Sequence, residues 1–322
     1  MHAIAITDTG MRWQPGAELP TCGADEVTIN VAWAGMNRAD LMQRAGLYPP
    51  PPGASEILGL EVSGEVSQVG ANVTHLKPGD PVCALLTGGG YASEVTVPAA
   101  QVLPIPAGFS LEQAAALPEV FATAWLNLYI VGDLKPGQRL LLHAAASGVG
   151  TAVIQLAKAM GNPVFATAGS DEKLAFCRKL GAEATWNRHH GSFADKVREW
   201  GGADMVLDPV GGSYLGQNQK ALNPDGRIVL IGRMGGRKAE IDSGLMLMKR
   251  QRLIGSTLRS LPVAAKGEVM DALYETVWPM LESGEIVPVI DRTWPITKAD
   301  EAMAYLESNS STGKVLLAIP QT

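Results

Sequence analysis

The order of apolar and polar residues divides the chain into a strand-rich first part and a second part in which strands and helices alternate. Every second residue from Val27 to Trp33 is apolar, which is the period of a half-buried strand. Further short apolar runs follow, separated by turns rich in glycine and proline, such as 77–81 and 88–90. Many short strands joined by such turns predict a partly open β-barrel over residues 1–118.

The stretch 139–173 has the pattern of one βαβ unit. An apolar run at 139–144 precedes a turn of small residues, and apolar residues at helical spacing continue to Gly161. A second apolar run, 163–168, completes the unit. Four more strand-like runs alternate with helical segments, at 184–187, 204–208, 227–232 and 253–256. Six such strands predict an α/β domain over residues 119–261, with a doubly wound parallel sheet.

The last sixty residues or so return to a mixed pattern and end in an apolar run at 314–319. We expect this run to be a strand that returns to the first domain. The first domain would then be discontinuous, formed by residues 1–118 together with 262–322.

Composition narrows the function classes. A formal net charge of −6 and the absence of a Lys/Arg-rich run argue against a nucleic-acid surface. No run of about 18 or more apolar residues occurs, so we expect no membrane span. The three cysteines, Cys22, Cys83 and Cys177, are scattered without a CxxC pair, which suits a reducing cytoplasm.

The small residues at 145–150 suit a phosphate-binding turn. A helix begins with unpaired N–H groups and partial positive charge, and a pyrophosphate binds there only if no bulky side chain blocks it. Ala145, Ser147 and Gly150 take the three glycine places of a degraded G-x-G-x-x-G pattern. The pattern predicts a dinucleotide site; the alternative is a tight strand–helix turn without a ligand.

The end of the second strand indicates which dinucleotide binds. An acidic residue there would hydrogen-bond the adenosine ribose of NAD, but the strand ends in Gly169 and Ser170. Lys173 and Arg188 are cations within reach of a 2′-phosphate, so the sequence favours NADPH over NADH. The alternative for either cation is solvated surface charge.

Glycines also follow the fourth and fifth strands, at 211–212 and 232–236. Parallel sheets bind ligands at the carboxyl ends of their strands, so these glycines suit a close approach of the nicotinamide half. The alternative is ordinary loop glycines. Gly232 and Met234, together with Ser256 after the sixth strand, therefore complete the set of cofactor-binding candidates.

Several motifs together resemble the quinone oxidoreductase branch of the medium-chain dehydrogenases/reductases. They lie at 37–41, 59–64, 143–150 and 231–236, and they follow the family's order over nearly the whole chain. The segment 48–54 and the Gly169–Ser170 strand end are similar to the p53-inducible quinone oxidoreductase subgroup. The resemblance implies a GroES-like barrel domain and a Rossmann domain, with NADPH in the cleft between them.

The resemblance also implies a site without metal. Asn37 stands where zinc alcohol dehydrogenases keep a cysteine, and Leu60 stands where they keep a histidine, although Glu61 beside it is retained. The four-cysteine structural loop is absent between residues 85 and 97. A zinc site needs three or four converging ligands, and the scattered cysteines and histidines give no such spacing.

By position, the resemblance assigns roles to individual residues. Asn37 and Tyr48 would line the substrate side near the nicotinamide, and Thr123 would approach its ribose or carboxamide. The relatives often have a tyrosine where this chain has Arg188; an arginine would clamp phosphate instead. The pyrophosphate would be held by Ala146, Ser147, Gly148 and Val149, and the 2′-phosphate by Gly169, Ser170 and Lys173.

These features predict a zinc-independent NADPH:quinone oxidoreductase that transfers a hydride, or single electrons, to quinones. One alternative is an NADPH-dependent enoyl or alkenal reductase of the same fold; another is a non-catalytic NADPH-binding sensor or structural protein.

Tyr48 would donate the proton or form the wall of a site for flat aromatic substrates, with water as the rival donor, and Asn37 would position the substrate. A homodimer through edge strands of the Rossmann domain is expected, with 242–248 as an apolar contact or as core.

Overall fold

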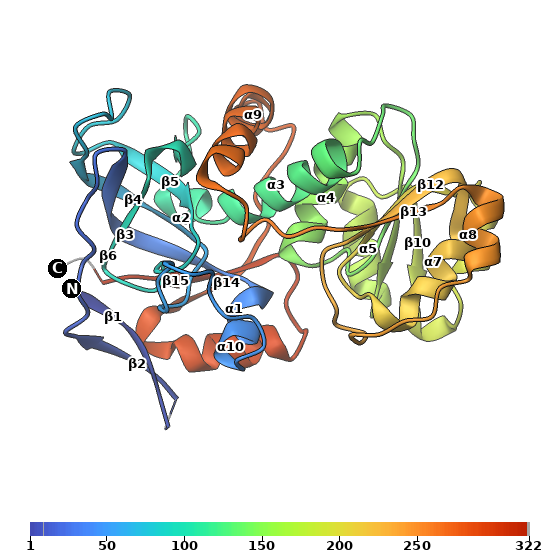
Figure 1. Cartoon of the computed structure of the whole chain (residues 1–322), viewed down its shortest axis with the longest axis horizontal. Helices are drawn as coiled ribbons and strands as arrows, with labels where there is room; N and C mark the ends of the chain where they lie inside the picture. The colour runs from blue at the N-terminus through green and yellow to red at the C-terminus, as the bar shows by residue number, and fades with distance from the viewer. Residues whose placement is uncertain (9, 321–322) are drawn as a thin grey trace. The chain divides into compact units, whose positions relative to one another are not determined.

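The computed structural model describes residues 1–8 and 10–320, which form two compact units. The first unit comprises Met1–Ala122 and Arg259–Thr322, and the second comprises Thr123–Leu258 (Figure 1). The sequence predicts that the second domain begins at residue 119 and ends at residue 261. In the structure the second unit begins at residue 123 and ends at residue 258.

The first unit is built on a seven-stranded sheet. Its strand order is β14-β15-β3-β4-β5-β7, with β6 also paired to β3. Val27, Ile29 and Val31 of β3 are buried, as their alternation predicted, but Thr28 on the opposite face is buried too and Trp33 is only half-buried. The bounds are β3 (Glu26–Met36), β4 (Glu61–Val69), β5 (Pro81–Leu85), β6 (Glu94–Pro98), β7 (Val102–Pro104), β14 (Ile290–Pro295) and β15 (Lys314–Ala318), besides the hairpin β1 (His2–Thr7) and β2 (Gly10–Pro15).

The C-terminal strand belongs to the first unit. β15 pairs antiparallel with β3, so that Val315 lies opposite Met36 and Leu317 opposite Ala34. The core of the unit draws on both ends of the chain, because buried Ile29 and Val62 share one apolar cluster with Met303 and Leu317. The helices of this unit are α1 (Arg38–Arg44), α2 (Leu111–Ala114), α9 (Val263–Glu282) and α10 (Ala299–Glu307), with short 3₁₀ turns at Ala99–Gln101 and Ile296–Lys298.

A proline begins a helix in this fold. The sequence Ser110-Leu111-Glu112-Gln113 has the form of a capping box and predicts a helix that Pro118 ends. The cap is confirmed, because Ser110 Oγ accepts a hydrogen bond from the N–H of Gln113 at 3.2 Å. Pro118, however, is the first residue of α3 (Pro118–Trp125). The first turn of a helix has no intrahelical partner for its N–H groups, so a proline there loses no hydrogen bond.

The second unit is a parallel α/β sheet, as predicted. The strand order β10-β9-β8-β11-β12-β13 reverses at β8, which is the topology of a doubly wound Rossmann sheet. The strands are β8 (Leu140–Leu142), β9 (Val164–Ala168), β10 (Ala184–Asn187), β11 (Ala203–Asp208), β12 (Leu222–Leu230) and β13 (Arg252–Gly255).

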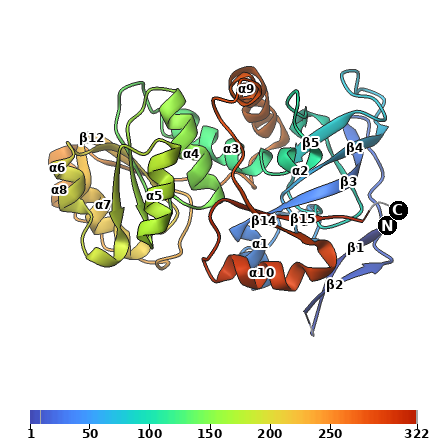
Figure 2. The same ribbon diagram turned by 180° about the vertical axis from the view of Figure 1, so that it is seen from behind.

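Helices connect these strands. Contacts join α4 to α5, and α6 to α7, and the rear view shows α4 and α5 side by side (Figure 2). The crevice at the carboxyl ends of β8 and β11, where the order reverses, is the usual ligand site of such sheets. The bounds are α4 (Gly148–Ala159), α5 (Asp171–Leu180), α6 (Ala194–Glu199), α7 (Leu215–Ala221) and α8 (Ser243–Lys249), with a π-helix at Leu126–Val131 and 3₁₀ turns at Arg188–His190 and Gly212–Tyr214.

One helical stretch passes the length and composition test for a membrane span, although the sequence has no long uninterrupted apolar run. It covers Leu111–Val131, and 67% of its most apolar window is buried within the protein. Such burial is typical of the core helix of a globular domain.

Candidate functional site

The turn before α4 has the features of a phosphate-binding turn. Ser147 is the N-cap, and its Oγ accepts a hydrogen bond from the N–H of Gly150 at 3.1 Å. Gly148 and Val149 are half-buried, and as the first helical residues they have no intrahelical acceptor for their N–H groups. A Cβ at Gly150 would collide with the carbonyl oxygen of Ala145, so only glycine allows this close packing. The turn therefore leaves a helix N-terminus accessible to an anion.

The end of β9 brings a cation against the predicted 2′-phosphate position. Ser170 caps α5, and its Oγ accepts from the N–H of Lys173 at 3.2 Å. The Arg188 guanidinium lies beside Gly169, because a Cβ built there would be 3.1 Å from Arg188 Nε. The nearby Asp171 accepts a hydrogen bond from Asn187 Nδ2 at 2.9 Å. The structure thus gathers Gly169, Ser170 and Arg188 at one strand end, with Lys173 in the adjoining first turn.

The glycines after β11 and β12 pack against one another. A Cβ at Gly212 would collide with the carbonyl oxygen of Gly235, and one at Gly232 with that of Pro209. Close contact between the two loops is therefore sufficient to explain these glycines. Met234, in the second loop, is 44% exposed, and Ser256 is half-buried, with its N–H donating to Leu230 O at 3.0 Å.

A buried histidine network joins these loops to the sheet, and sequence reasoning missed it. Asn218 Nδ2 donates to Asp208 Oδ2 at 2.8 Å, so Asn218 Oδ1 must accept from His143 Nε2 at 2.7 Å. Nδ1 of His143 then accepts from Thr167 Oγ1 at 2.8 Å. Burial lowers the pKa of His143, while Asp208 opposes that shift. A neutral imidazole therefore holds β8, β9, β11 and α7 together, and Asp208 Oδ1 receives the N–H of Gly211 at 2.9 Å.

Asn37 lies in a buried polar network of the first unit. Its Nδ2 donates to Glu61 Oε1 at 2.9 Å, and its Oδ1 accepts from Lys314 Nζ at 2.8 Å. Lys314 also forms an ion pair with Glu61, and the side chains of both are almost wholly buried. The other oxygen of Glu61 accepts the N–H of Glu119 at 2.9 Å. The Asn37 amide is thus held in one orientation by a buried ion pair, which suits a positioning role.

Asp40 is a second buried carboxylate near Asn37. Its Oδ2 accepts from the N–H of Asn37 at 2.7 Å and from the Tyr91 hydroxyl at 2.9 Å, and its Oδ1 accepts from Gly59 N at 3.2 Å. Burial raises the pKa of Asp40 from 3.8 to about 6, although these hydrogen bonds oppose the shift. The carboxylate therefore opposes folding at neutral pH.

We expect Asp40 to give the protein a distinctive pH dependence of stability. A carboxyl group whose pKa is raised on folding stabilises the protein below its unfolded value, 3.8, and that stability is lost as the pH rises through about 6. Asp40→Asn lacks this titration. Wild-type stability minus variant stability, measured by urea unfolding, should fall by about 2 kcal/mol between about pH 4 and pH 7. Parallel pH profiles would contradict the expectation.

Tyr48 lies beside a buried arginine rather than beside Asn37. The ring of Tyr48 is half-buried, and Cζ of Arg259 lies 5.3 Å from its centroid. Burial raises the pKa of Tyr48; Arg259 opposes the shift and Glu119 adds to it. Among the described residues, no hydrogen bond joins the Tyr48 and Asn37 side chains. Thr123 lies on α3, half-buried, and its carbonyl accepts from Asn127 Nδ2 at 2.7 Å.

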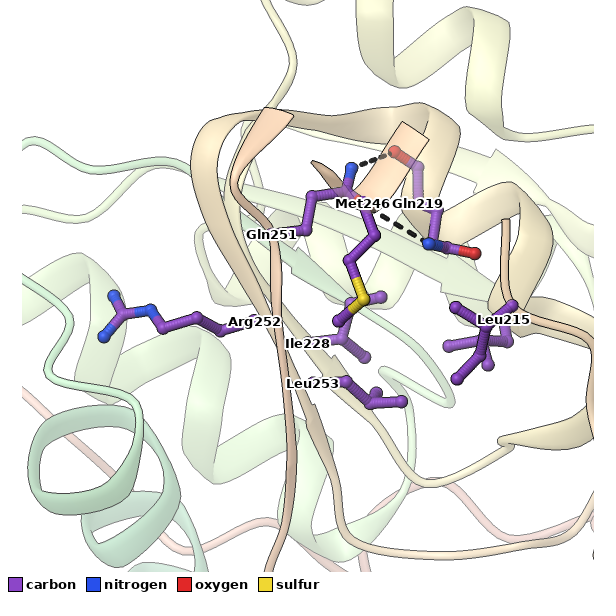
Figure 3. A pocket seen from close by; sticks show the side chains of 8 residues that line it. Leu215, Gln219, Ile228, Met246, Gln251, Arg252 and Leu253 are labelled. Atoms are coloured by element: carbon purple, nitrogen blue, oxygen red, sulfur yellow. Dashed lines mark hydrogen bonds between the residues drawn. The ribbon is translucent and has the colours of Figure 1, made fainter. Parts of the chain in front are cut away.

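A small pocket of the second unit is separate from all these residues. It lies between α7, α8 and the β12–β13 edge, and Gln219 and Gln251 are joined across it by hydrogen bonds of 2.6 and 3.2 Å (Figure 3). Its volume is about 10 Å³, enough for a single water molecule. None of the predicted site residues lines it.

Comparison with known proteins places the chain in a family. A model of zinc-binding dehydrogenases matches residues 148–275, and a model of alcohol dehydrogenase GroES-like domains matches residues 23–107. The synaptic vesicle membrane protein VAT-1 homolog of Rattus norvegicus is 33% identical over 317 residues, covering 92% of this chain and 78% of the relative. The chain belongs to the medium-chain dehydrogenase/reductase superfamily. Within it, this reductase falls in the branch that contains quinone oxidoreductases, enoyl reductases and VAT-1 homologues.

Solved structures agree with this placement of the medium-chain reductase. The quinone oxidoreductase of Escherichia coli, in complex with NADPH, is 27% identical with a TM-score of 0.86, over 99% of this chain and 100% of that one. The CurK enoyl reductase is 29% identical with a TM-score of 0.85, over 99% of both chains. The predicted pairing of a GroES-like domain with a six-stranded Rossmann sheet is confirmed, as is the quinone oxidoreductase branch in this wider form.

The zinc in the family description does not fit the residues of this reductase. Within residues 1–8 and 10–320, no group of three or more His, Cys, Asp or Glu side chains converges as metal ligands. The two polar side chains at the position where a metal would be expected, Asn37 and Glu61, already bind the buried ammonium of Lys314. That cation would repel a metal ion placed beside it. The Lys314 ammonium therefore occupies the position beside Asn37 and Glu61 where a metal ion would have to bind.

Proposed function

We propose that this medium-chain reductase is an NADPH:quinone oxidoreductase that works without a metal ion. The observation that supports NADPH is the strand end at Gly169 and Ser170, which lacks an acid and has the Arg188 guanidinium against it. An acid would favour the free ribose hydroxyl, whereas a guanidinium favours a 2′-phosphate. The likeness to a quinone oxidoreductase in complex with NADPH supports the same choice.

The chain's own residues fit this cofactor, which supplies a hydride when bound. Ser147, Gly148 and Val149 would hold the pyrophosphate through the N–H groups at the start of α4. Buried Ala146 keeps side-chain bulk out of the turn. Lys173 and Arg188 would hold the 2′-phosphate, since both cations lie next to the strand end that carries Gly169.

Residues of the first unit would hold the acceptor. Asn37, whose amide is fixed by Glu61 and Lys314, would orient a carbonyl oxygen with the second N–H of Nδ2, which would leave its 3.4 Å hydrogen bond to Gly35 O. Tyr48, whose ring lies next to the Arg259 guanidinium, would be the phenol that delivers a proton. Quinones accept a hydride without metal polarisation because the negative charge is delocalised onto oxygen.

We expect Tyr48→Phe to lower kcat by about tenfold to a hundredfold with KM changed only a few-fold, since a positioned general acid contributes roughly 10²–10⁴ in rate and water can replace it in part. Steady-state NADPH oxidation measures both constants. Tyr274→Phe, at a half-exposed tyrosine on α9, is the matched control. Turnover within a few-fold of wild type would leave Tyr48 as a wall of the site only.

An acceptor screen tests the proposed function. We expect NADPH oxidation to be fastest with 1,2- or 1,4-quinones and slower with α,β-unsaturated carbonyl compounds. The opposite order would make the protein an enoyl or alkenal reductase, a function that the likeness to CurK favours. NADPH binding without oxidation in the presence of every acceptor would indicate a non-catalytic protein. The p53-inducible subgroup and the cytoplasmic location stay predictions from the sequence.

We also propose that the protein is a homodimer through the second unit. β13 is an edge strand of the sheet, and the neighbouring α8 leaves Leu247 and Met248 each 77% exposed, so these residues are not core. Exposed edges and apolar side chains are typical of subunit contacts.

We expect Leu247→Lys with Met248→Lys to shift the mass measured by light scattering from dimer towards monomer. Lys179→Glu, at an exposed position on α5, is the control. Lys249 is unsuitable as a control because its Nζ donates a hydrogen bond to Leu222 O.

A further inference from the structure

Two buried cations near Tyr48 have no carboxylate partner. Arg259 is 5% exposed and Lys266 is 2% exposed. The third buried cation of the first unit, Lys314, forms an ion pair with Glu61. Among the residues that the structure describes, no carboxylate lies within ion-pair distance of Arg259 or Lys266. Buried charges are normally paired, so this arrangement requires an explanation.

Neutral groups hold the two cations in place. Arg259 Nε donates to Thr87 O at 2.9 Å, and Nη2 donates to Gln43 Oε1 at 2.7 Å. Lys266 Nζ donates to Thr87 Oγ1 at 2.7 Å, so both cations converge on the same residue. A guanidinium has five N–H donors and an ammonium has three. Each cation therefore keeps donors beyond those used by these partners.

The electrostatics of this pair favour an added negative charge. Burial lowers the pKa of Arg259 and that of Lys266, and Arg259 lowers the pKa of Lys266 further by repulsion. Tyr48, Asp40 and Glu119 oppose the shift of Arg259, and Glu119 opposes that of Lys266, but neither carboxylate lies within ion-pair distance of the two cations. Tyr48, Thr87 and Gln43 around the cations are half-buried, so the cluster borders the surface of the unit. An anion placed there would offset positive charge that the two carboxylates compensate only from a distance.

We propose that Arg259 and Lys266 form an oxyanion subsite beside Tyr48, which binds the negatively charged oxygen of a reduced quinone or enone. The proposal rests on the reductase function proposed above. Hydride addition to the conjugated acceptor forms a C–H bond, shifts the conjugated π electrons and places the carbonyl electron pair on oxygen. Bound NADPH would supply the hydride with its two electrons and would leave as NADP⁺. The oxygen then takes a proton from the Tyr48 hydroxyl or from water, and the two cations stabilise the charge until it does.

The subsite can be tested without turnover by titrating the full chain with 4-nitrophenol, whose ionised form absorbs visible light. The spectrum therefore reports whether the bound phenol is charged. We expect the bound phenol to have its pKa lowered by about one unit or more, which is a preference of about tenfold or more for the phenolate. The measurement is made with and without NADP⁺.

Variants assign the effect to the two cations. Arg259→Gln and Lys266→Met should each abolish the preference for phenolate, whereas Arg259→Lys and Lys266→Arg keep the charge and should retain most of it. Lys298→Met removes an exposed cation of the same unit and should change nothing. The proposal would be overturned if the neutralised variants preferred phenolate as strongly as the wild type does. It would also be overturned if the wild type bound only the neutral phenol, or bound no phenol at all.

If the neutralised variants fail to fold, as judged by their unfolding curves, the wild-type spectrum and the two charge-retaining variants still decide the question. The outcome is also independent of the reductase function. A phenolate preference in a protein that oxidises no NADPH would support the anion subsite and contradict the proposed reaction. Quinone reduction by a protein that binds only neutral phenol would support the proposed reaction and contradict the anion subsite.

Discussion

Lys314→Met will lower the free energy of unfolding by about 3–5 kcal/mol, the usual cost of removing one partner of a buried ion pair. Lys314 Nζ forms an ion pair with Glu61 and donates to Met36 O at 2.7 Å and to Asn37 Oδ1 at 2.8 Å. Without the ammonium, the Glu61 carboxylate stays buried with its charge uncompensated. Urea unfolding monitored by fluorescence measures the change.

A double variant separates charge from packing. Glu61→Gln with Lys314→Met removes both charges, so it should recover a large part of the lost stability. Lys298→Met is the matched control, because Lys298 is an exposed lysine whose ion pair with Glu301 spans 3.6 Å, and it should change stability by less than about 1 kcal/mol. A Lys314→Met change as small as that of the control would show that the buried pair does not stabilise the first unit.

Replacing both Lys173 and Arg188 by alanine should weaken NADPH binding by about 100-fold and leave NADH binding within about threefold. Each charge-assisted hydrogen bond to phosphate contributes roughly 1.5–3 kcal/mol, and the two cations lie at the strand end with Gly169. NADH lacks the 2′-phosphate and loses none of these contacts. Calorimetric titration of both dinucleotides measures the effect.

Lys179→Ala provides the matched control for this prediction. Lys179 lies in the last turn of α5, exposed and away from the strand end, so its loss should change neither affinity. Raising the salt concentration should weaken NADPH binding to the wild type more than NADH binding. Equal weakening of both dinucleotides in the double variant would mean that Lys173 and Arg188 support the fold of the site and do not read the 2′-phosphate.

The elements of the fold could be predicted because their signals are local. Apolar periodicity located the strands of the second unit, and β10 (Ala184–Asn187) has the predicted bounds. The small residues before α4 predicted an open helix N-terminus, and Ser147 caps it. The sequence predicts that Pro118 ends a helix, whereas Pro118 begins α3, because a proline stops a helix in its interior but is tolerated at its first turn.

The side-chain networks could not be predicted because their partners are distant in the sequence. Lys314 and Glu61 are 253 positions apart, and Arg259 and Tyr48 are 211 apart. Periodicity shows which face of an element is buried, but not which buried polar groups meet. His143 follows three leucines at the end of β8, so its burial was foreseeable, whereas its bond to Asn218, 75 positions away, was not.

The central claim is that this chain binds NADPH and passes its reducing equivalents to a quinone without a metal ion. The most direct measurement is NADPH oxidation by chelator-treated protein, followed at increasing quinone concentration with chelator still present. We expect saturable oxidation at the same rate as in untreated protein, and little oxidation of NADH at equal concentration. Activity that appears only when Zn²⁺ is added, or the absence of NADPH binding in calorimetry, would contradict it.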